Sequence, residues 1–338
     1  MSLDAAAWDA FAAAQPQTHL LQTAAWGQLK AAFGWQPVPI RADAAGALVL
    51  FRRLPLGLTL AYVPRGPLAN WQQPAELKTL VAALDAACRA RRAILLKWEP
   101  DLPDDPGCAA QLASLGFRAS PHTVQPRRSL MVDLSGSEAE VLGRMKQKTR
   151  YNIGLAGKKG VTARTAQGSQ DMERFIALMQ TTGARDGFGI HAPEYYRRAY
   201  ALFHPTGRCE LLLAEHEGQL LAGVMAFAHG PQAWYLYGAS SDQERPRMAP
   251  YLAQWAAMRW ARSQGAVAYD LWGVPDEDEA ALEAGFEQRH DGLWGVYRFK
   301  RGFGGKLVRT IGAWDRVYNP LLYRAYRLYL QRRGLSLG

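Results

Sequence analysis

Positive charge is concentrated in two stretches of this 338-residue chain, and that concentration is the first sign of chemistry in the sequence. Residues 141–164 contain seven Lys or Arg and no acid, and residues 298–338 contain ten with one acid, Asp315. The stretches carry +7 and +9 against +10 for the whole chain. Two solvated helix faces are the alternative, but two such clusters favour a polyanionic partner such as nucleic acid, a phosphate-bearing ligand or an anionic membrane surface.

The first basic stretch has the signals of a single helix. Ser137 and Glu140 form a capping box at its start, and Lys158-Lys159 followed by Gly160 is typical of its end. One face at helical spacing consists of Leu142, Met145, Thr149 and Ile153. The basic side chains exceed what a helix terminus needs, which favours phosphate contact. The candidates are Arg144, Lys146, Lys148, Arg150, Lys158 and Lys159.

The second basic stretch begins with a glycine-rich segment, RFKRGFGGK, at residues 298–306. It lacks the spacing of a nucleotide phosphate loop, so its three glycines indicate a tight turn beside a ligand instead. Lys300 is expected to project from a strand that ends there. After Pro320, the sequence LLYRAYRLYLQRR predicts an aromatic and basic helix. Its Tyr and Leu positions favour packing, with contact to a membrane surface as the alternative.

The elements that must position these candidates occur in the same order twice, roughly 170 residues apart. The order is two strands, a helix, a strand, an acidic loop and a short helix, and it closes on Gly-Phe before a final strand. We predict strands 46–52, 58–63 and 93–98 with helix 74–92, then strands 218–227, 233–238 and 266–272 with helix 249–264. A period this long indicates a duplicated domain, and 338 residues suit two domains of ordinary size.

That order resembles the acyltransferase fold of the N-acetyltransferase (GNAT) superfamily, in which an activated acyl donor binds where two central strands diverge. We therefore predict an α/β protein with two tandem GNAT-like domains of mixed sheets flanked by helices. Coenzyme A-dependent members hold the pyrophosphate in a glycine-rich loop. The equivalent loops here, residues 64–74 and 239–250, lack that motif, and the second offers Arg245 and Arg247 for side-chain pairing with phosphate.

Composition argues against several other classes of protein. Three cysteines and seven histidines show no metal-ligand spacing, so neither a disulfide framework nor a metal site is expected. Residues 1–15 have acidic rather than basic residues ahead of an apolar stretch, unlike a secretory signal, and no run approaches the length of a membrane span. The sequence predicts a soluble, cytoplasmic protein.

Five motifs follow one another along the chain: RMKQKTRYNIGLAGKKGV (144–161), RDGF with EYY (185–196), YLYGAS (235–240), YDLWGV (269–274) and FKRGFGG (299–305). Together they resemble the Fem family of peptidoglycan-branching enzymes, over nearly the whole chain. No charged heptad insertion of the kind that forms the coiled-coil arm of some members is present. The chain therefore resembles the compact members without the arm.

The resemblance implies a reaction in which an amino acid passes from aminoacyl-tRNA to the side-chain amine of the peptidoglycan stem peptide and builds the interpeptide bridge. It implies no cofactor. The implied partners are aminoacyl-tRNA, a UDP-linked or lipid-linked muramyl-pentapeptide precursor and, peripherally, the inner membrane surface, with the protein a monomer. The last helices fold back in this family, so we expect a first domain of residues 1–140 plus 312–338 and a second of 141–311.

The implied chemistry gives each candidate a role. Lys300, in the position of the family's Phe-Lys motif, would stabilise charge at the reacting carbonyl. Asp101, in the acidic loop after strand 93–98, is a candidate for holding or deprotonating the attacking amine, with Glu99, Asp104 and Asp105 as alternatives. The candidate precursor contacts are Lys30, Trp98, Arg185, Tyr237, Arg245, Arg247, Tyr251 and Phe299. A solvated helix end is the alternative for Lys30, and core packing is the alternative for the strand aromatics. The six basic residues of the first stretch become tRNA contacts.

Two other functions stay open on the sequence alone. A coenzyme A-dependent N-acyltransferase acting on a small amine would need coenzyme A binding, which the loop chemistry disfavours. A non-catalytic RNA-binding protein would use the charge but gives no reason for an acyltransferase core that occurs twice. The sequence does not determine which amino acid is transferred, or how many.

Overall fold

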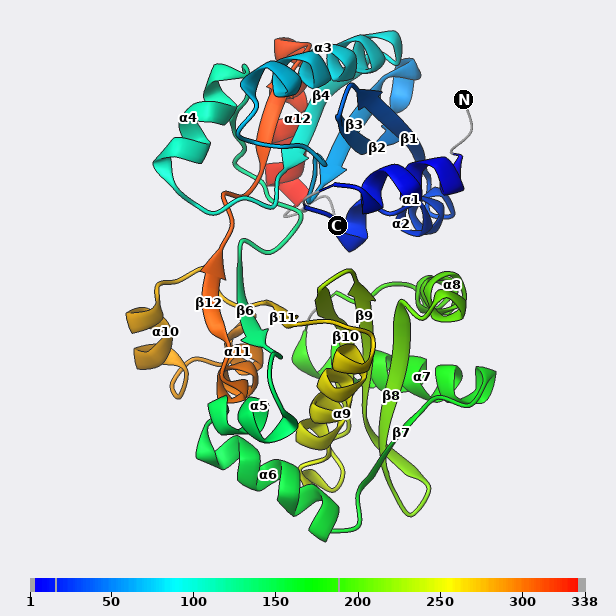
Figure 1. The fold of residues 1–338 in the computed structure, drawn as a ribbon, viewed down its shortest axis with the longest axis vertical. Coiled ribbons are helices and arrows are strands. Elements are labelled where there is room, and N and C mark those ends of the chain that lie inside the picture. The colour runs from blue at the N-terminus through cyan, green and yellow to red at the C-terminus, as the bar shows by residue number, and fades with distance from the viewer. Residues whose placement is uncertain (1–3, 16, 188, 334–338) are drawn as a thin grey trace. The chain divides into compact units, whose positions relative to one another are not determined.

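The computed structural model describes residues 4–333, apart from residues 16 and 188. The chain forms two compact units, residues 1–127 with 309–338 and residues 128–308 (Figure 1). The second unit begins earlier than the expected boundary after residue 140, because strand β6 (Arg128–Asp133) pairs with a strand of that unit. Phe188 of the RDGF motif and residues 334–338 of the basic C-terminal stretch lie outside the described residues.

The first unit is built on a six-stranded sheet. Its order is β1 (Trp35–Ala42), β2 (Ala45–Arg53), β3 (Thr59–Pro64), β4 (Ala93–Glu99), β13 (Trp314–Val317) and β5 (Arg118–Ala119). Only β3 and β4 run parallel, and the C-terminal strand β13 completes the sheet beside β4. One face packs against α3 (Pro74–Ala90) and α4 (Pro106–Ser114), the other against α1 (Ala5–Ala13), α2 (Ala24–Ala31) and α12 (Pro320–Arg333).

The second unit is built on a seven-stranded sheet. Its order is β12 (Lys306–Arg309), β6, β11 (Ala268–Gly273), β10 (Gln232–Ser240), β9 (Gln219–His229), β8 (Cys209–His216) and β7 (Thr162–Thr165). Successive side chains of β9 point to opposite faces. Val224 and Ala226 belong to the core formed with α9 (Ala249–Ser263), whereas Phe227 stacks edge-on against Phe203 of α8 (Pro193–Phe203). Helix α7 (Ser169–Asp186) also lies on the α8 face, where its Phe175 lies next to Gly223.

The predicted duplication appears in the order and direction of the elements. β2, β3, α3, β4 and α4 correspond to β9, β10, α9, β11 and α10 (Glu279–Gly285). β3 and β4 are parallel in the first unit, as are β10 and β11 in the second. The sequence analysis missed the strand that precedes each set, β1 and β8. β1 contains Pro37 and Pro39, which are tolerated because β1 pairs only with β2 at the edge of its sheet.

The first basic stretch is not a single helix, and that prediction is wrong. It forms α5 (Glu138–Arg144) and α6 (Gln147–Lys158), because Met145 between them adopts an extended backbone with ψ of 153°. Arg150 of α6 donates hydrogen bonds back to the carbonyl oxygens of Gly143 and Met145, which helps to hold the break. The capping box of Ser137 with Glu140 is confirmed.

Lys300 does not project from a strand, and this prediction is also wrong. It is the last residue of helix α11 (Trp294–Lys300), which is followed by the predicted glycine turn. Gly304 has φ of 77°, and a Cβ there would collide with the backbone of Arg144. Only glycine therefore allows this turn to lie so close to the end of α5.

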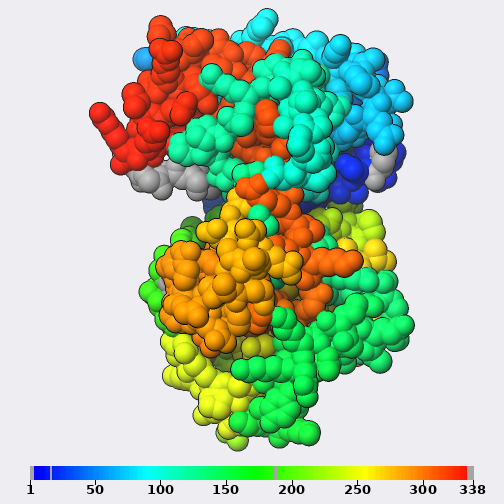
Figure 2. Space-filling model, turned by 90° about the vertical axis from the view of Figure 1, so that its left-hand side faces the viewer, coloured from blue at the N-terminus to red at the C-terminus, as the bar shows by residue number. Residues whose placement is uncertain are grey.

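Helix α12 forms as predicted after Pro320 and lies on the surface of the first unit (Figure 2). Tyr323 and Leu330 are buried, whereas Leu321 and Leu328 are exposed. No helix among the described residues is long and apolar enough to cross a membrane. The longest described helix, α7, has 18 residues, so the described chain contains no long coiled-coil arm.

Candidate active site

The parallel strands β10 and β11 of the second unit diverge soon after they meet. Their pairing covers only residues 232–234 with residues 268–270. A bulge in β10 between Tyr235 and Tyr237 bends it away from its neighbour. In the first unit, by contrast, β3 and β4 stay paired as far as Pro64 and Glu99. The opening expected for an acyl donor is therefore present between the parallel strands of the second unit and closed in the first.

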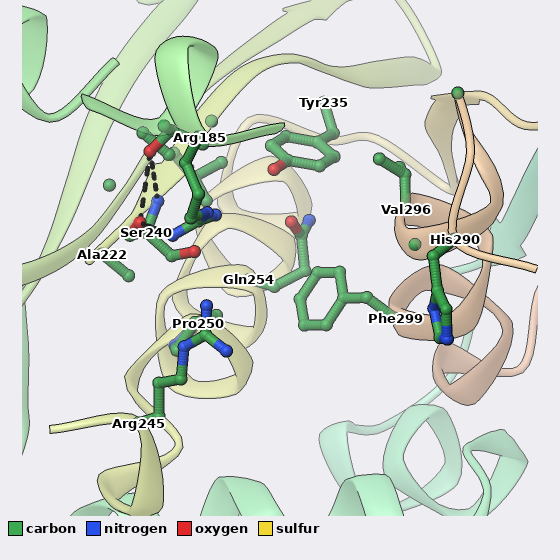
Figure 3. A pocket seen from close by; sticks show the side chains of 17 residues that line it. Arg185, Ala222, Tyr235, Ser240, Arg245, Pro250, Gln254, His290, Val296 and Phe299 are labelled. Carbon is green, nitrogen blue, oxygen red and sulfur yellow. Dashed lines mark hydrogen bonds between the residues drawn. The ribbon is translucent and has the colours of Figure 1, made fainter. Parts of the chain in front are cut away.

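A cavity of about 610 Å³ lies beside this divergence, within the second unit (Figure 3). Its walls come from β9, β10, α7, the start of α9, α11 and the loop before α11. The polar side chains among its lining residues are Thr182, Arg185, Tyr235, Ser240, Arg245, Gln254 and His290. Phe299, Val296 and Pro250 supply apolar surface. The volume and the mixture of apolar walls with a few polar groups are typical of a site for an organic ligand.

Lys300 lies next to this cavity but is almost fully buried, with 5% of its surface exposed. Its Nζ donates a hydrogen bond to the carbonyl oxygen of Gly273 at 2.9 Å and lies 5.4 Å from the ring centre of Tyr235, which lines the cavity. Burial lowers the pKa of Lys300 from 10.5 to about 7, against the opposing effect of the Asp270 carboxylate. The amine therefore changes charge near neutral pH, as reactive lysines do.

The backbone that receives this hydrogen bond is strained. Trp272, which precedes Gly273, has φ of 63°, a conformation that a large side chain rarely adopts. Its backbone N–H donates to Asp270 at 2.7 Å, and the pairing of β11 with β6 is irregular over the same residues. Strain of this kind concentrates at functional sites. Here the strained residue directly precedes Gly273, whose carbonyl oxygen orients the amine of Lys300.

Arg185 and Arg245 both line the cavity. The sequence analysis names them as candidate precursor contacts, which stays a prediction. Arg185 donates to the carbonyl oxygen of Ser240 and to the carboxylate of Asp242, each at 2.9 Å. Arg245 donates to the same carboxylate, while its own side chain is 67% exposed. Hydrogen bonding to Arg245 and the charge of Arg185 lower the pKa of Asp242. One carboxylate thus orients two guanidinium groups, and the exposed one marks the mouth of the cavity.

The other candidates from the second unit divide into two groups. Phe299 lines the cavity, and Tyr251 packs against it with ring centres 5.1 Å apart. Tyr237 instead joins an aromatic cluster with Tyr195 and Tyr196 beyond the cavity wall. Arg247 also lies outside the lining, where it pairs with Glu244 and donates to the carbonyl oxygen of Lys159. The structure brings Arg185, Arg245 and Phe299 together and separates Tyr237 and Arg247 from them.

In the first unit, the acids of the predicted acidic loop have different partners. Glu99 is buried, and it accepts hydrogen bonds from the Tyr62 hydroxyl and from two backbone amides. Asp104 pairs with two arginines, and Asp105 caps α4. Asp101 is half-exposed and has a longer contact of 3.5 Å with Arg65. Of these four acids, Asp101 thus has the weakest structural contact.

The remaining first-unit candidates differ in accessibility. Trp98 is fully buried, packs against the tilted ring of Phe117 and donates to the carbonyl oxygen of Gly66, so it belongs to the core. Lys30, at the end of α2, is half-buried with its Nζ 5.0 Å from the Trp26 ring centre. Burial, together with the charge of Arg52, lowers the pKa of Lys30 to about 8. The sequence analysis did not identify Arg52 as a neighbour of Lys30.

Four of the six basic candidates on α5 and α6 make contacts that support the fold. Arg144 and Arg150 bond to backbone carbonyls, Lys146 pairs with Glu283, and Lys159 donates to the carbonyl oxygen of Pro246. Lys148 and Lys158 are exposed on α6. Tyr151, one turn from Lys148, is exposed to 64%. These three side chains recur at helical spacing and form one surface, which we call the α6 face.

The sequence analysis missed several lining residues, above all Gln254 and Tyr235. Gln254 is fully buried in α9, between residues of an otherwise apolar helix face. A glutamine at such a position was a usable signal, because buried polar side chains need partners. Tyr235 belongs to a motif that was noticed, but its position at a bulge depends on pairing with β9.

Comparison with known proteins shows the family and agrees with the fold. A sequence model of the FemAB family matches residues 3–104, 109–218 and 210–331. The chain is similar to the lipid II:glycine glycyltransferase of Staphylococcus saprophyticus, with 27% identity over 96% of this chain and 94% of that protein. The crystal structure of FemX matches with a TM-score of 0.85 at 24% identity, covering 96% of this chain and 98% of that one.

A second solved structure bears on the fold alone. The tandem GNAT protein from the clavulanic acid biosynthesis pathway has a TM-score of 0.51 at 13% identity, covering 83% of this chain and 82% of that one. The prediction of two tandem GNAT-like domains is confirmed.

Proposed function

We propose that this chain, which belongs to the FemAB family, transfers an amino acid from aminoacyl-tRNA to the side-chain amine of a peptidoglycan stem peptide and so builds the interpeptide bridge. The cavity of the second unit carries the proposal. It occupies the place where the acyltransferase fold opens for an activated acyl donor, with Lys300 beside it. Its mouth presents Arg245 where coenzyme A-dependent enzymes have a glycine-rich loop.

The proposed chemistry is aminolysis of an activated ester. The amine nitrogen attacks the ester carbonyl, the new C–N bond forms, and the C–O bond to the ribose breaks. The ribose oxygen leaves as a hydroxyl with the proton that the amine gives up. Protonated Lys300 stabilises the negative oxygen of the tetrahedral intermediate, since its Nζ has N–H groups beyond the one bonded to Gly273.

The α6 face is our candidate for the RNA backbone of the donor. Lys148 and Lys158 supply charge that the fold does not use, and Tyr151 between them offers an exposed ring. Phosphate contacts by lysine, together with stacking on an aromatic ring, are the usual means by which proteins bind RNA without reading sequence. The other four basic candidates support this surface through their structural contacts.

The first unit is our candidate for the precursor. Lys30 and Arg52 lie close enough for the charge of Arg52 to lower the pKa of Lys30. A diphosphate placed against both side chains would relieve their repulsion, as phosphate groups do at paired cations. Asp101 remains our candidate for holding the attacking amine, because a half-exposed carboxylate can reach a substrate. UDP-linked and lipid-linked precursors carry the same diphosphate, so both belong in the test.

The test is transfer of an amino acid in a purified system. The protein is incubated with a panel of charged tRNAs and with either precursor, and mass spectrometry detects the added residue on the stem peptide. Lys300→Ala should lower kcat roughly 10²-fold, whereas Lys306→Ala, on an exposed lysine of β12, should not. Transfer from acetyl-coenzyme A in place of charged tRNA, or no transfer from any charged tRNA, would disprove the proposal.

A further inference from the structure

Gln254, which lines the cavity, has a buried hydrogen-bond acceptor without a partner among the described residues. Its side chain is fully buried, and its Nε2 donates to the Tyr269 hydroxyl at 2.7 Å. No donor among the described residues reaches its Oε1. Figure 3 shows the amide between the Tyr235 and Phe299 rings, in the wall of the cavity. Because the nitrogen donates to Tyr269, the oxygen is the atom of this amide that lacks a partner among the described residues.

A buried acceptor without a partner destabilises a protein, so its presence needs a compensating role. The hydroxyl of Tyr235, another polar group of the cavity wall, does not provide one. The Tyr235 hydroxyl lies against Gly238, where a Cβ would overlap it. Neighbouring positions of the same helix, Ala253 and Trp255, are apolar and buried, so apolar packing at position 254 would be the simpler solution.

The cavity has an exposed end and a buried end. Arg245 marks its exposed mouth, and Gln254 is fully buried on its wall. Lys300 lies beside the Tyr235 ring, which lines the cavity. A donor whose phosphates stay near the arginines would place its acyl group among Tyr235, Phe299 and Gln254. At that end, an aminoacyl group differs from a simple acyl group by one hydrogen-bond donor, its α-amino group.

We propose that Oε1 of Gln254 accepts a hydrogen bond from the α-amino group of the donor, so that Gln254 is a specificity-determining residue for aminoacyl over simple acyl groups. The proposal rests on the proposed function, because it takes the cavity as the site of the acyl donor. Rejection of an analogue that lacks one hydrogen-bonding group is a strong form of selectivity, since the buried partner is then left unpaired.

The test uses binding of stable donor mimics and therefore does not depend on turnover. The mimics are 3′-amino-3′-deoxyadenosine acylated on its 3′ nitrogen with glycyl or acetyl, and with alanyl or propionyl. Members of each pair differ only in the α-amino group. Titration calorimetry measures Kd for the wild-type protein and for four variants. Gln254→Leu and Gln254→Met remove the acceptor, Gln254→Glu keeps one, and Gln264→Leu changes an exposed glutamine just after the same helix.

The wild-type protein should bind the aminoacyl mimics at least about tenfold more tightly than the simple acyl mimics. Gln254→Leu and Gln254→Met should abolish that preference by weakening only the aminoacyl mimics, and Gln254→Glu and Gln264→Leu should retain it. Equal binding of both mimics to the wild type, no binding of either, or equal weakening of both by Gln254→Leu and Gln254→Met would overturn the proposal.

The outcome is separable from that of the transfer assay. Transfer of an amino acid by a protein that binds both mimics equally would leave the proposed function standing and remove Gln254 from donor recognition. A preference for aminoacyl mimics in a protein that transfers nothing from any charged tRNA would support the role of Gln254 and overturn the proposed reaction.

Discussion

Replacement of Lys300 by methionine should make the protein more stable at neutral pH while it removes activity. Burial lowers the pKa of this lysine from 10.5 to about 7, so the folded protein binds the proton of Lys300 less tightly than the unfolded chain does. The difference opposes folding by about 5 kcal/mol at pH values below 7. Methionine fills a similar volume without a charge.

The gain is partly offset by a lost hydrogen bond. Without Lys300, the carbonyl oxygen of Gly273 loses its donor, and an unsatisfied buried acceptor costs about 1–3 kcal/mol. We therefore expect Lys300→Met to raise the free energy of unfolding by about 2 kcal/mol at pH 7. The sign follows from the direction of the pKa change. The penalty in the wild type is complete below the folded pKa and disappears as pH rises toward 10.5, where the unfolded lysine also loses its proton.

The stability difference should therefore depend on pH. From pH 7 to pH 9, the advantage of Lys300→Met over the wild type should shrink by about 2 kcal/mol. Urea unfolding followed by tryptophan fluorescence at both pH values measures it, with separate transitions fitted if the two units unfold independently. Lys306→Met, on an exposed lysine, is the matched control and should show no pH-dependent difference. A difference for Lys300→Met that stays constant over this range would refute the argument that Lys300 is a buried, perturbed amine.

Three further predictions concern the site. The wild-type rate should rise with pH as the acceptor amine loses its proton and then level off above about pH 7, where Lys300 loses its charge. The rate of Lys300→Arg should be lower than that of the wild type but should continue to rise above pH 7. A wild-type profile without a plateau would contradict the role of the Lys300 charge. Lys148→Glu combined with Lys158→Glu should weaken tRNA binding and lower the slope of log affinity against log salt by about 2, while Lys78→Glu on the first unit should leave filter-binding curves unchanged. Gly238→Ala should displace the tyrosine ring of the cavity wall and raise KM for the donor about tenfold, a loss of binding that steady-state kinetics would detect.

Local patterns in the sequence were enough to identify the repeated elements. Strands such as β9 and β10 and helices such as α3 and α9 follow from runs of apolar residues and from their periodicity, which act within a few residues. The capping box at Ser137 is equally local, because its two hydrogen bonds join residues three apart. The same local signals failed between α5 and α6, where Met145 continues the helical pattern although the chain turns there. The turn is held by Arg150 from the next helix.

Only the tertiary structure decided which half of the duplication opens to a ligand. The two halves have the same order of elements, but β10 leaves β11 at a bulge whose position depends on pairing with β9, and such pairing joins residues far apart in the chain. The low pKa of Lys300 likewise results from burial by several elements, and the unpartnered oxygen of Gln254 from the absence of a donor among those of its neighbours that the structure describes. Residue types and helical or strand periodicity are properties of short segments. Burial, strand divergence and hydrogen-bond satisfaction are properties of the packed chain, and they determine where the chemistry can occur.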